Sequence, residues 1–179
     1  MTQDYITTYT KEHFTPLDPQ LDQIHIEDIA HALSLMTRAN GHFPEFYSVA
    51  QHCIQCGKEA IARGYSRRVI LACLLHDGSE AYLSDITRPV KQNMPEYKQI
   101  EKRLQDVIYQ KFLGSVLTEE EVRQVKDVDD TCLYHEFKHY MGEELSNTCM
   151  EMKSESNFTV RDMKEVELEL VRMVDSYKI

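Results

Sequence analysis

The sequence has no tryptophan, few residues that break regular structure (6 glycines and 5 prolines in 179 residues) and no long apolar run. So little glycine and proline argues against a collagen-like or disordered chain. A membrane-spanning helix would need about 20 mostly apolar residues, and the first residues, MTQDYITTYTKEHF, do not resemble a secretory signal. We therefore expect a single folded domain over residues 1–179, located in the cytoplasm.

Positive charge is also scarce, because 30 Asp and Glu residues outnumber 20 Lys and Arg residues and give a formal net charge of −10. Duplex nucleic acid and anionic membranes are bound through basic surfaces, so we expect neither as a partner. The charge is uneven, however: residues 51–112 carry 10 basic and 7 acidic side chains. A small phosphorylated ligand remains compatible with this stretch.

Five cysteines are an odd number for a disulfide framework. A chain of this length does not need disulfides to be stable, so we expect reduced thiols. Cys53 and Cys56 form a C-x-x-C pair, but both fall on the apolar stripe of a predicted helix. We interpret them as small buried hydrophobic residues.

Apolar residues at helical spacing predict an all-α fold, a compact bundle of about six to eight helices. Capping-box patterns predict three helix starts, at Ser48, Thr118 and Thr159. Residues 1–24 are expected to be irregular, and no convincing strand is found. The predicted helices cover residues 26–38, 48–63, 66–75, 95–113, 118–140 and, after Thr159, about 160–174.

Four polar residues stand in apolar surroundings. Asp129 falls in the middle of the apolar face of its helix, His76 and Asp77 end the most apolar segment, and His52 lies beside an apolar stripe. Taken singly, each has an ordinary explanation, such as a salt bridge or a core histidine. Together they provide two imidazoles and two carboxylates, which suit one divalent ion: Mn²⁺, Co²⁺, Fe²⁺, Mg²⁺ or Zn²⁺. Two further carboxylates, those of Glu80 and Asp85, could reach the same cavity.

The order His52, His76-Asp77, Asp129 resembles the H…HD…D pattern of the HD-domain metal-dependent phosphohydrolases. The segment LHDGSEAYLSDITRPVKQNMPEYKQIEK is similar to the 5′-deoxynucleotidase branch of that superfamily, as are YSVAQH and VKDVDDTCLY. The resemblance covers roughly residues 26–140. It implies an HD-type helical domain and a nucleotide substrate, and dimers or higher homo-oligomers are common among such proteins.

Residue by residue, the resemblance implies that His52, His76, Asp77 and Asp129 hold one divalent metal ion. It makes Glu80 the general acid or base, and Asp85 a residue that orients the attacking water or contacts the sugar. Arg38 and Lys91 would bind the phosphate. The reaction would remove phosphate from (deoxy)nucleoside 5′-monophosphates, with the ion lowering the pKa of a bound water.

The sequence departs from that branch after Arg38, where the branch has a tryptophan and this chain has Ala39-Asn40-Gly41. Base and sugar preference therefore stay open. So does the alternative of a deoxynucleoside triphosphate triphosphohydrolase, such as a dATPase, or of an enzyme for another small phosphoester. A non-catalytic binding module is a further alternative.

A more distant alternative is a zinc protease, because residues 135–139 read His-Glu-Phe-Lys-His and match the H-E-x-x-H motif. No histidine follows His139 to supply a third ligand. The helical projection also places Glu136 on the buried face. We expect the match to be accidental.

Overall fold

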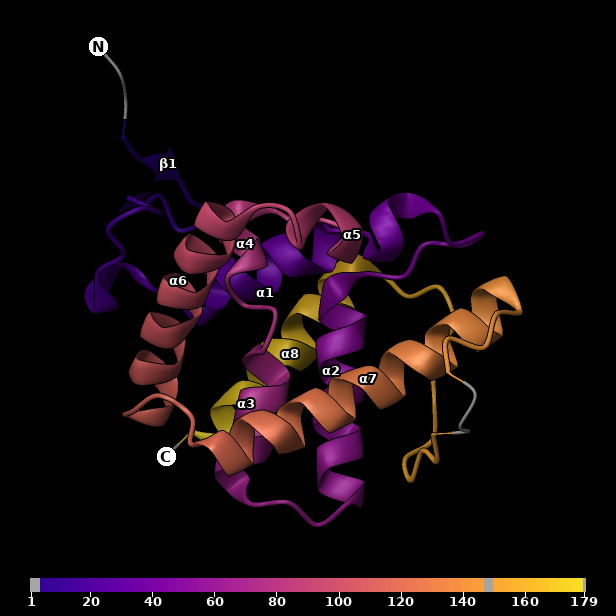
Figure 1. The fold of residues 1–179 in the computed structure, drawn as a ribbon. Helices are drawn as coiled ribbons and strands as arrows, with labels where there is room; N and C mark the ends of the chain where they lie inside the picture. The colour runs from indigo at the N-terminus through magenta and orange to yellow at the C-terminus, as the bar shows by residue number, and fades with distance from the viewer. Residues whose placement is uncertain (1–3, 147–149, 179) are drawn as a thin grey trace.

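Helices form nearly all the regular structure of a computed structural model that describes residues 4–146 and 150–178 (Figure 1). The all-α prediction is confirmed. The elements are, in chain order, β1 (Ile6–Thr7), β2 (His13–Phe14), the 3₁₀ turn η1 (Leu21–Gln23), α1 (Ile26–Leu35), the 3₁₀ turn η2 (Arg38–Gly41), α2 (Val49–Ala62), α3 (Arg67–Leu75), α4 (Glu80–Leu83), α5 (Arg88–Lys91), α6 (Pro95–Leu113), α7 (Glu119–Met141) and α8 (Met163–Tyr177).

Local capping fixes where the main helices begin and end. The side chains of Ser48 and Thr118 each accept a hydrogen bond from the backbone N–H three residues later. In turn, the side chains of Gln51 and Glu121 accept from the backbone N–H of Ser48 and Thr118, so both capping boxes are confirmed. Ser66 caps α3 in the same way without the returned bond. These bonds satisfy backbone N–H groups that have no partner within the helix.

Three local predictions are wrong. Residues 1–24 contain a short antiparallel pairing, Ile6 with Phe14, where an irregular segment was expected. Helix α1 ends at Leu35 rather than Arg38. Helix α8 begins at Met163 because the Asp162 carboxylate accepts the N–H groups of the first turn, whereas a start at Thr159 was expected.

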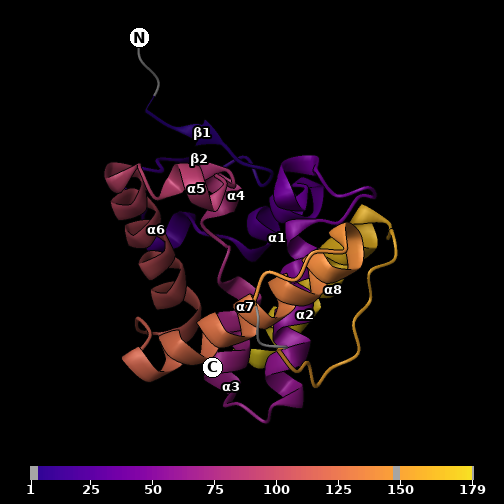
Figure 2. The same cartoon turned by 45° about the vertical axis from the view of Figure 1, so that its right-hand side comes forward.

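The central helix pair, α2 and α3, carries the core. All seven residues from Val69 to Leu75 are buried, as expected for a helix with neighbours on every side. Figure 1 shows α7 in front of this pair and α8 behind it, and both helices pack on α2 and α3. In the view of Figure 2 the N-terminal strands lie beside α4 and α5, where Phe14 stacks on Tyr82 at 4.1 Å between ring centroids.

The two longest helices, α6 with 19 residues and α7 with 23, each bury only one side. Among residues 4–146 and 150–178, no helix is both long and apolar enough to cross a membrane.

A buried carboxylate fastens the segment after α7 to the middle of the bundle. Glu59 on α2 is fully buried. It accepts hydrogen bonds from the backbone N–H groups of Lys153 and Ser154, from the Ser154 hydroxyl and from Arg63 at 2.7 Å. Burial alone would raise the pKa of Glu59, but the bonds from Arg63, Ser154 and Lys153 lower it below 4.5.

Glu59→Ala is expected to lower the free energy of unfolding by about 1–3 kcal/mol, since it leaves the donors of Lys153 and Ser154 without their acceptor. Arg63 keeps its bonds to Asp127 and Thr131. Because the folded pKa of Glu59 lies below its unfolded value near 4.5, this contribution is present above pH 4.5 and is lost as the pH falls through the folded pKa. Urea unfolding at pH 7 and in acid measures both effects. Glu120→Ala is the control, because Glu120 forms an exposed ion pair with Arg123. It should change the free energy of unfolding little. Equal losses for the two variants would contradict the prediction.

Candidate metal centre

The four predicted metal ligands come from three parts of the chain and lie close together. Among the described residues, one compact group joins His52, His76 and Asp129 with Cys56, and a second joins Asp77 with His76 and Cys53. His52 lies in α2, His76 directly follows α3 with Asp77 beside it, and Asp129 lies in α7. Because α2, α3 and α7 pack together, residues that are far apart in sequence become neighbours.

Their ligand atoms lie at separations that suit a shared ion. The Nε2 atom of His52 is 3.2 Å from Nε2 of His76, 3.1 Å from Oδ1 of Asp129 and 3.9 Å from Oδ2 of Asp77. The Nε2 atom of His76 is 3.4 Å from Oδ1 of Asp77. Ligands bound about 2.1 Å from one ion are roughly 3.0–3.5 Å apart, so the cluster is close to the spacing required for coordination.

The second nitrogen of each imidazole has a partner that leaves Nε2 available. The His52 Nδ1–H donates to Glu136 Oε1 at 2.6 Å, and the His76 Nδ1–H donates to the carbonyl of Cys73 at 2.8 Å. Such outer hydrogen bonds fix the orientation of metal-binding histidines. Sequence analysis missed this role of Glu136, although its position seven residues after Asp129 placed both on one face of α7.

The electrostatics of the cluster favour a bound cation. Burial and the positive charge of Arg38 each lower the pKa of His52. Glu136 and Asp129 raise it by more than this, so the resulting pKa is about 10. Burial raises the pKa of the Asp129 carboxyl, but His52 and His76 bring it well below its usual range. The carboxylates therefore stabilise positive charge on the imidazoles, and a metal ion would take the place of those protons.

Glu136→Gln is expected to weaken metal binding by about 10–100-fold, because an amide holds the His52 imidazole less firmly and makes it less basic. Calorimetric titration with Mn²⁺ or Zn²⁺ measures the change. Glu167→Gln is the matched control, since Glu167 is also a buried carboxylate bound to a histidine, His31, at 3.0 Å. Unchanged affinity in Glu136→Gln would show that the bond does not support the site.

Glu80 lies next to the cluster, at the start of α4, with only 6% of its surface exposed. Its Oε2 atom is buried and has no hydrogen-bond partner among the described residues, and its Oε1 atom is 3.8 Å from the Lys91 ammonium. Burial, together with Asp77 and Asp85, raises the pKa of Glu80 to about 9. A carboxyl group in this state holds its proton at neutral pH and can donate it.

Two other predicted residues border the cluster. The guanidinium of Arg38 is largely buried, 3.4 Å from Asp77 Oδ2 and 3.5 Å from Glu136 Oε2. Asp85, in the loop after α4, is partly exposed and close enough to raise the pKa of Glu80. In the described parts of the chain, no direct hydrogen bond or ion pair joins Asp85 to the metal ligands.

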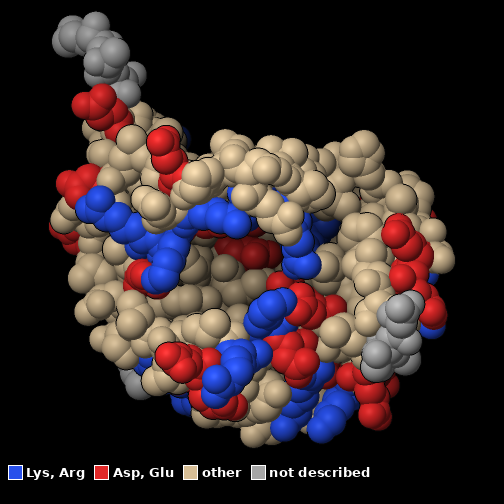
Figure 3. Space-filling model, viewed as in Figure 1, with Lys and Arg blue, Asp and Glu red and all other residues tan. Residues whose placement is uncertain are grey.

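A cleft of about 750 Å³ opens onto this cluster between α6 and α7. Figure 3 shows it as a hollow with acidic atoms in its depth and Lys and Arg side chains along its rim. His76, Asp77, Glu80 and Asp129 line the cleft, whereas His52 lies behind them. The basic side chains that line it are Lys91, Lys98, Lys102, Arg123 and Lys126.

The H-E-x-x-H residues do not converge as they do in a zinc protease. His135 Nε2 bonds to the carbonyl of Met150 at 2.7 Å, and the His139 ring stacks on Phe158 at 4.4 Å between centroids. Glu136 points to His52 instead. Among residues 4–146 and 150–178, the motif therefore contributes one carboxylate that binds the candidate ligand His52, and its two histidines belong to no group that could hold an ion.

Comparison with known proteins gives relatives without an assigned activity. The chain is 37% identical over 108 residues to the uncharacterized protein YfdR of Escherichia coli, covering 60% of this chain and 58% of that protein. It is 38% identical over 120 residues to the uncharacterized protein RCAP_rcc00048 of Rhodobacter capsulatus, covering 63% and 61%. The chain thus spans about three fifths of the length of these relatives. No protein-family profile matches it.

Proposed function

We propose that the chain is a divalent-metal-dependent phosphohydrolase of the HD-domain superfamily that removes phosphate from (deoxy)nucleoside 5′-monophosphates. The observation that carries this proposal is the convergence of His52, His76, Asp77 and Asp129 beside an accessible cleft, which three of them line. Four groups of the right chemistry, arriving from three elements in the order of the HD pattern, are difficult to explain as separate core contacts.

The bound ion would supply positive charge to the phosphate oxygens and lower the pKa of water in the site. The protein's own groups orient the ligands and transfer a proton. Glu136 and the Cys73 carbonyl orient the two imidazoles, while buried Glu80 holds a proton that it can give to the leaving oxygen.

We assign phosphate binding to two cations near the cluster, of which Lys91 lines the cleft. Lys91 lies between Glu80 and Glu101, with its ammonium 2.6 Å from Glu101 Oε1. Arg38 approaches the cluster from the side of Glu136. Charge added by these groups as the transition state forms would lower the barrier. Asp85 would act through Glu80 or on the sugar.

The cleft also supports a second candidate, the hydrolysis of a deoxynucleoside triphosphate. Lys98, Lys102, Arg123 and Lys126 line the cleft along α6 and α7. The last three of them also form ion pairs, with Asp106, Glu120 and Asp130. A ligand with several phosphates would use more of this rim than a monophosphate would. The two candidates share the metal centre and differ in the product released.

A panel of nucleoside mono- and triphosphates, assayed with Mn²⁺, Co²⁺ and Mg²⁺, tests the proposal. Orthophosphate released from monophosphates supports the first candidate, and inorganic triphosphate released from triphosphates supports the second. If no phosphoester is cleaved with any of the metals, while the ions bind, the proposed function is wrong.

A further inference from the structure

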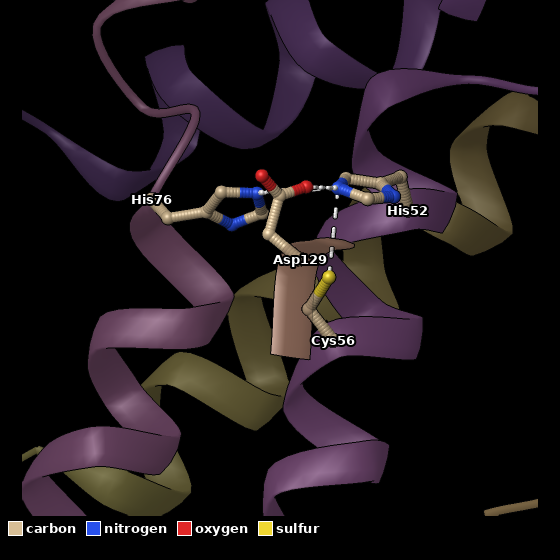
Figure 4. A group of neighbouring side chains, drawn as sticks. All are labelled: His52, Cys56, His76 and Asp129. Atoms are coloured by element: carbon tan, nitrogen blue, oxygen red, sulfur yellow. Dashed lines mark hydrogen bonds and ion pairs between the residues drawn. The ribbon is translucent and has the colours of Figure 1, made fainter. Parts of the chain in front are cut away.

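Cys56 lies one helical turn after His52 on α2 and points at the same centre. Its thiol is buried, with 1% of the residue exposed, and its Sγ is 3.5 Å from His52 Nε2. Ligand atoms of His52, Cys56, His76 and Asp129 all lie within 4.8 Å of one another. Figure 4 shows the sulfur and the Asp129 carboxylate both directed at the His52 ring nitrogen.

The separation between sulfur and nitrogen fits joint coordination. A metal–sulfur bond of about 2.3 Å and a metal–nitrogen bond of about 2.1 Å place the two atoms roughly 3.1 Å apart at a right angle and roughly 3.6 Å apart at a tetrahedral angle. The observed 3.5 Å lies between these values. The Asp77 oxygen nearest His52 Nε2 is farther away, at 3.9 Å.

Cys56 is buried and does not line the cleft. Asp77, Asp129 and His76 line the cleft, whereas His52 and Cys56 do not. A sulfur ligand on this inner side would leave the cleft side of the ion open to water or a phosphate oxygen. Coordination by Cys56 is therefore compatible with a catalytic centre.

We propose that Cys56 is a thiolate ligand of the metal centre and that it selects the ion. This inference shares its metal centre with the proposed function. When the metal–sulfur bond forms, the S–H bond breaks and its proton leaves to solvent, with no change of oxidation state. Thiolate is a soft ligand, so the centre prefers Zn²⁺, Co²⁺ or Fe²⁺ to Mg²⁺ or Mn²⁺.

Absorption spectroscopy of the full chain loaded with Co²⁺ tests the assignment, because thiolate coordination produces a charge-transfer band in the near ultraviolet. The wild type should show this band and Cys56→Ser should lack it. Cys53→Ser and Cys132→Ser, which alter other buried thiols, are the matched controls and should keep it. Cys53 is the more demanding control, since it lies within reach of His76 and Asp77.

Metal affinity gives a second readout. Cys56→Ser should lose at least about 10-fold in affinity for Zn²⁺ and Co²⁺, with less than about a 3-fold change for Mn²⁺. Circular dichroism of the metal-free variants checks folding. If Cys56→Ser does not fold, X-ray absorption of the Zn²⁺-loaded wild type decides, and it should show one sulfur at about 2.3 Å.

A wild type without the band or without a sulfur neighbour overturns the assignment, as does a band that persists in Cys56→Ser or disappears in Cys53→Ser. These measurements need no turnover. A protein that shows the band but cleaves no phosphoester retains the Cys56 ligand and refutes the proposed function. A protein that cleaves phosphoesters but lacks the band refutes the Cys56 ligand and supports the proposed function.

Discussion

His76→Ala is expected to lower the affinity for divalent ions by more than about 100-fold and to reduce phosphate release to background. Losing a residue that only hydrogen-bonds to a ligand already costs about 10–100-fold. As the proposed ligand, His76 has its Nε2 within 3.7 Å of His52, Asp77 and Asp129. Metal content by mass spectrometry and phosphate release, measured on the same preparation, check both effects.

His135→Ala is the control for this change. It removes an imidazole from α7 that bonds to the Met150 carbonyl, so metal content and activity should both remain. The control also addresses the protease alternative, in which His135 would be a ligand. Full metal content in His76→Ala would refute the ligand assignment, and loss of metal in His135→Ala would revive the alternative.

Glu80→Gln is expected to retain the metal and to lower kcat by about 10²–10⁴-fold, the usual contribution of a general acid or base. The amide has nearly the same shape but no proton to transfer. Because the pKa of Glu80 is raised to about 9, the carboxyl group is protonated at neutral pH. The wild-type rate should fall as the pH rises through this pKa, and the variant should not show that fall.

Glu101→Gln provides the comparison, because Glu101 also binds the Lys91 ammonium but is less buried than Glu80. It should change KM more than kcat. If Glu80→Gln turns over at the wild-type rate, then Glu80 is not the proton donor. If it loses the metal, its role is structural support of the centre.

Features set by neighbours along the chain could be predicted from the sequence. Capping at Ser48 and Thr118 and the buried run at 69–75 depend on residues within a turn or two. The candidate metal ligands were identified because a charged or imidazole group in an apolar stripe is costly without a partner, and because their order resembles the H…HD…D pattern. That argument identifies anomalous residues but does not say which atoms they contact.

Features set by the packing of one helix on another could not be predicted. Glu136 was assigned to the buried face, but its bond to His52 depends on how α7 crosses α2. Cys56 was interpreted as an ordinary buried residue, since a thiol satisfies an apolar stripe whether or not an ion lies beside it. The attachment of residues 153–154 to Glu59 depends on where the chain returns after α7.

Helix α8 packs on α1, α2 and α3 but is the last of the described helices to be synthesised, which affects how the protein folds on the ribosome. The N-terminus of a chain leaves the ribosome first, so α1, α2 and α3 emerge well before α8, the helix that covers them. Leu170 and Val174 of α8 are fully buried, and until they are synthesised the apolar surface that they cover is open to chaperones or to other nascent chains. The residues of the metal cluster, by contrast, have all been translated by position 129. The growing chain thus has the complete set of candidate metal ligands before it has a complete core, and an ion captured at that stage would stabilise the unfinished bundle.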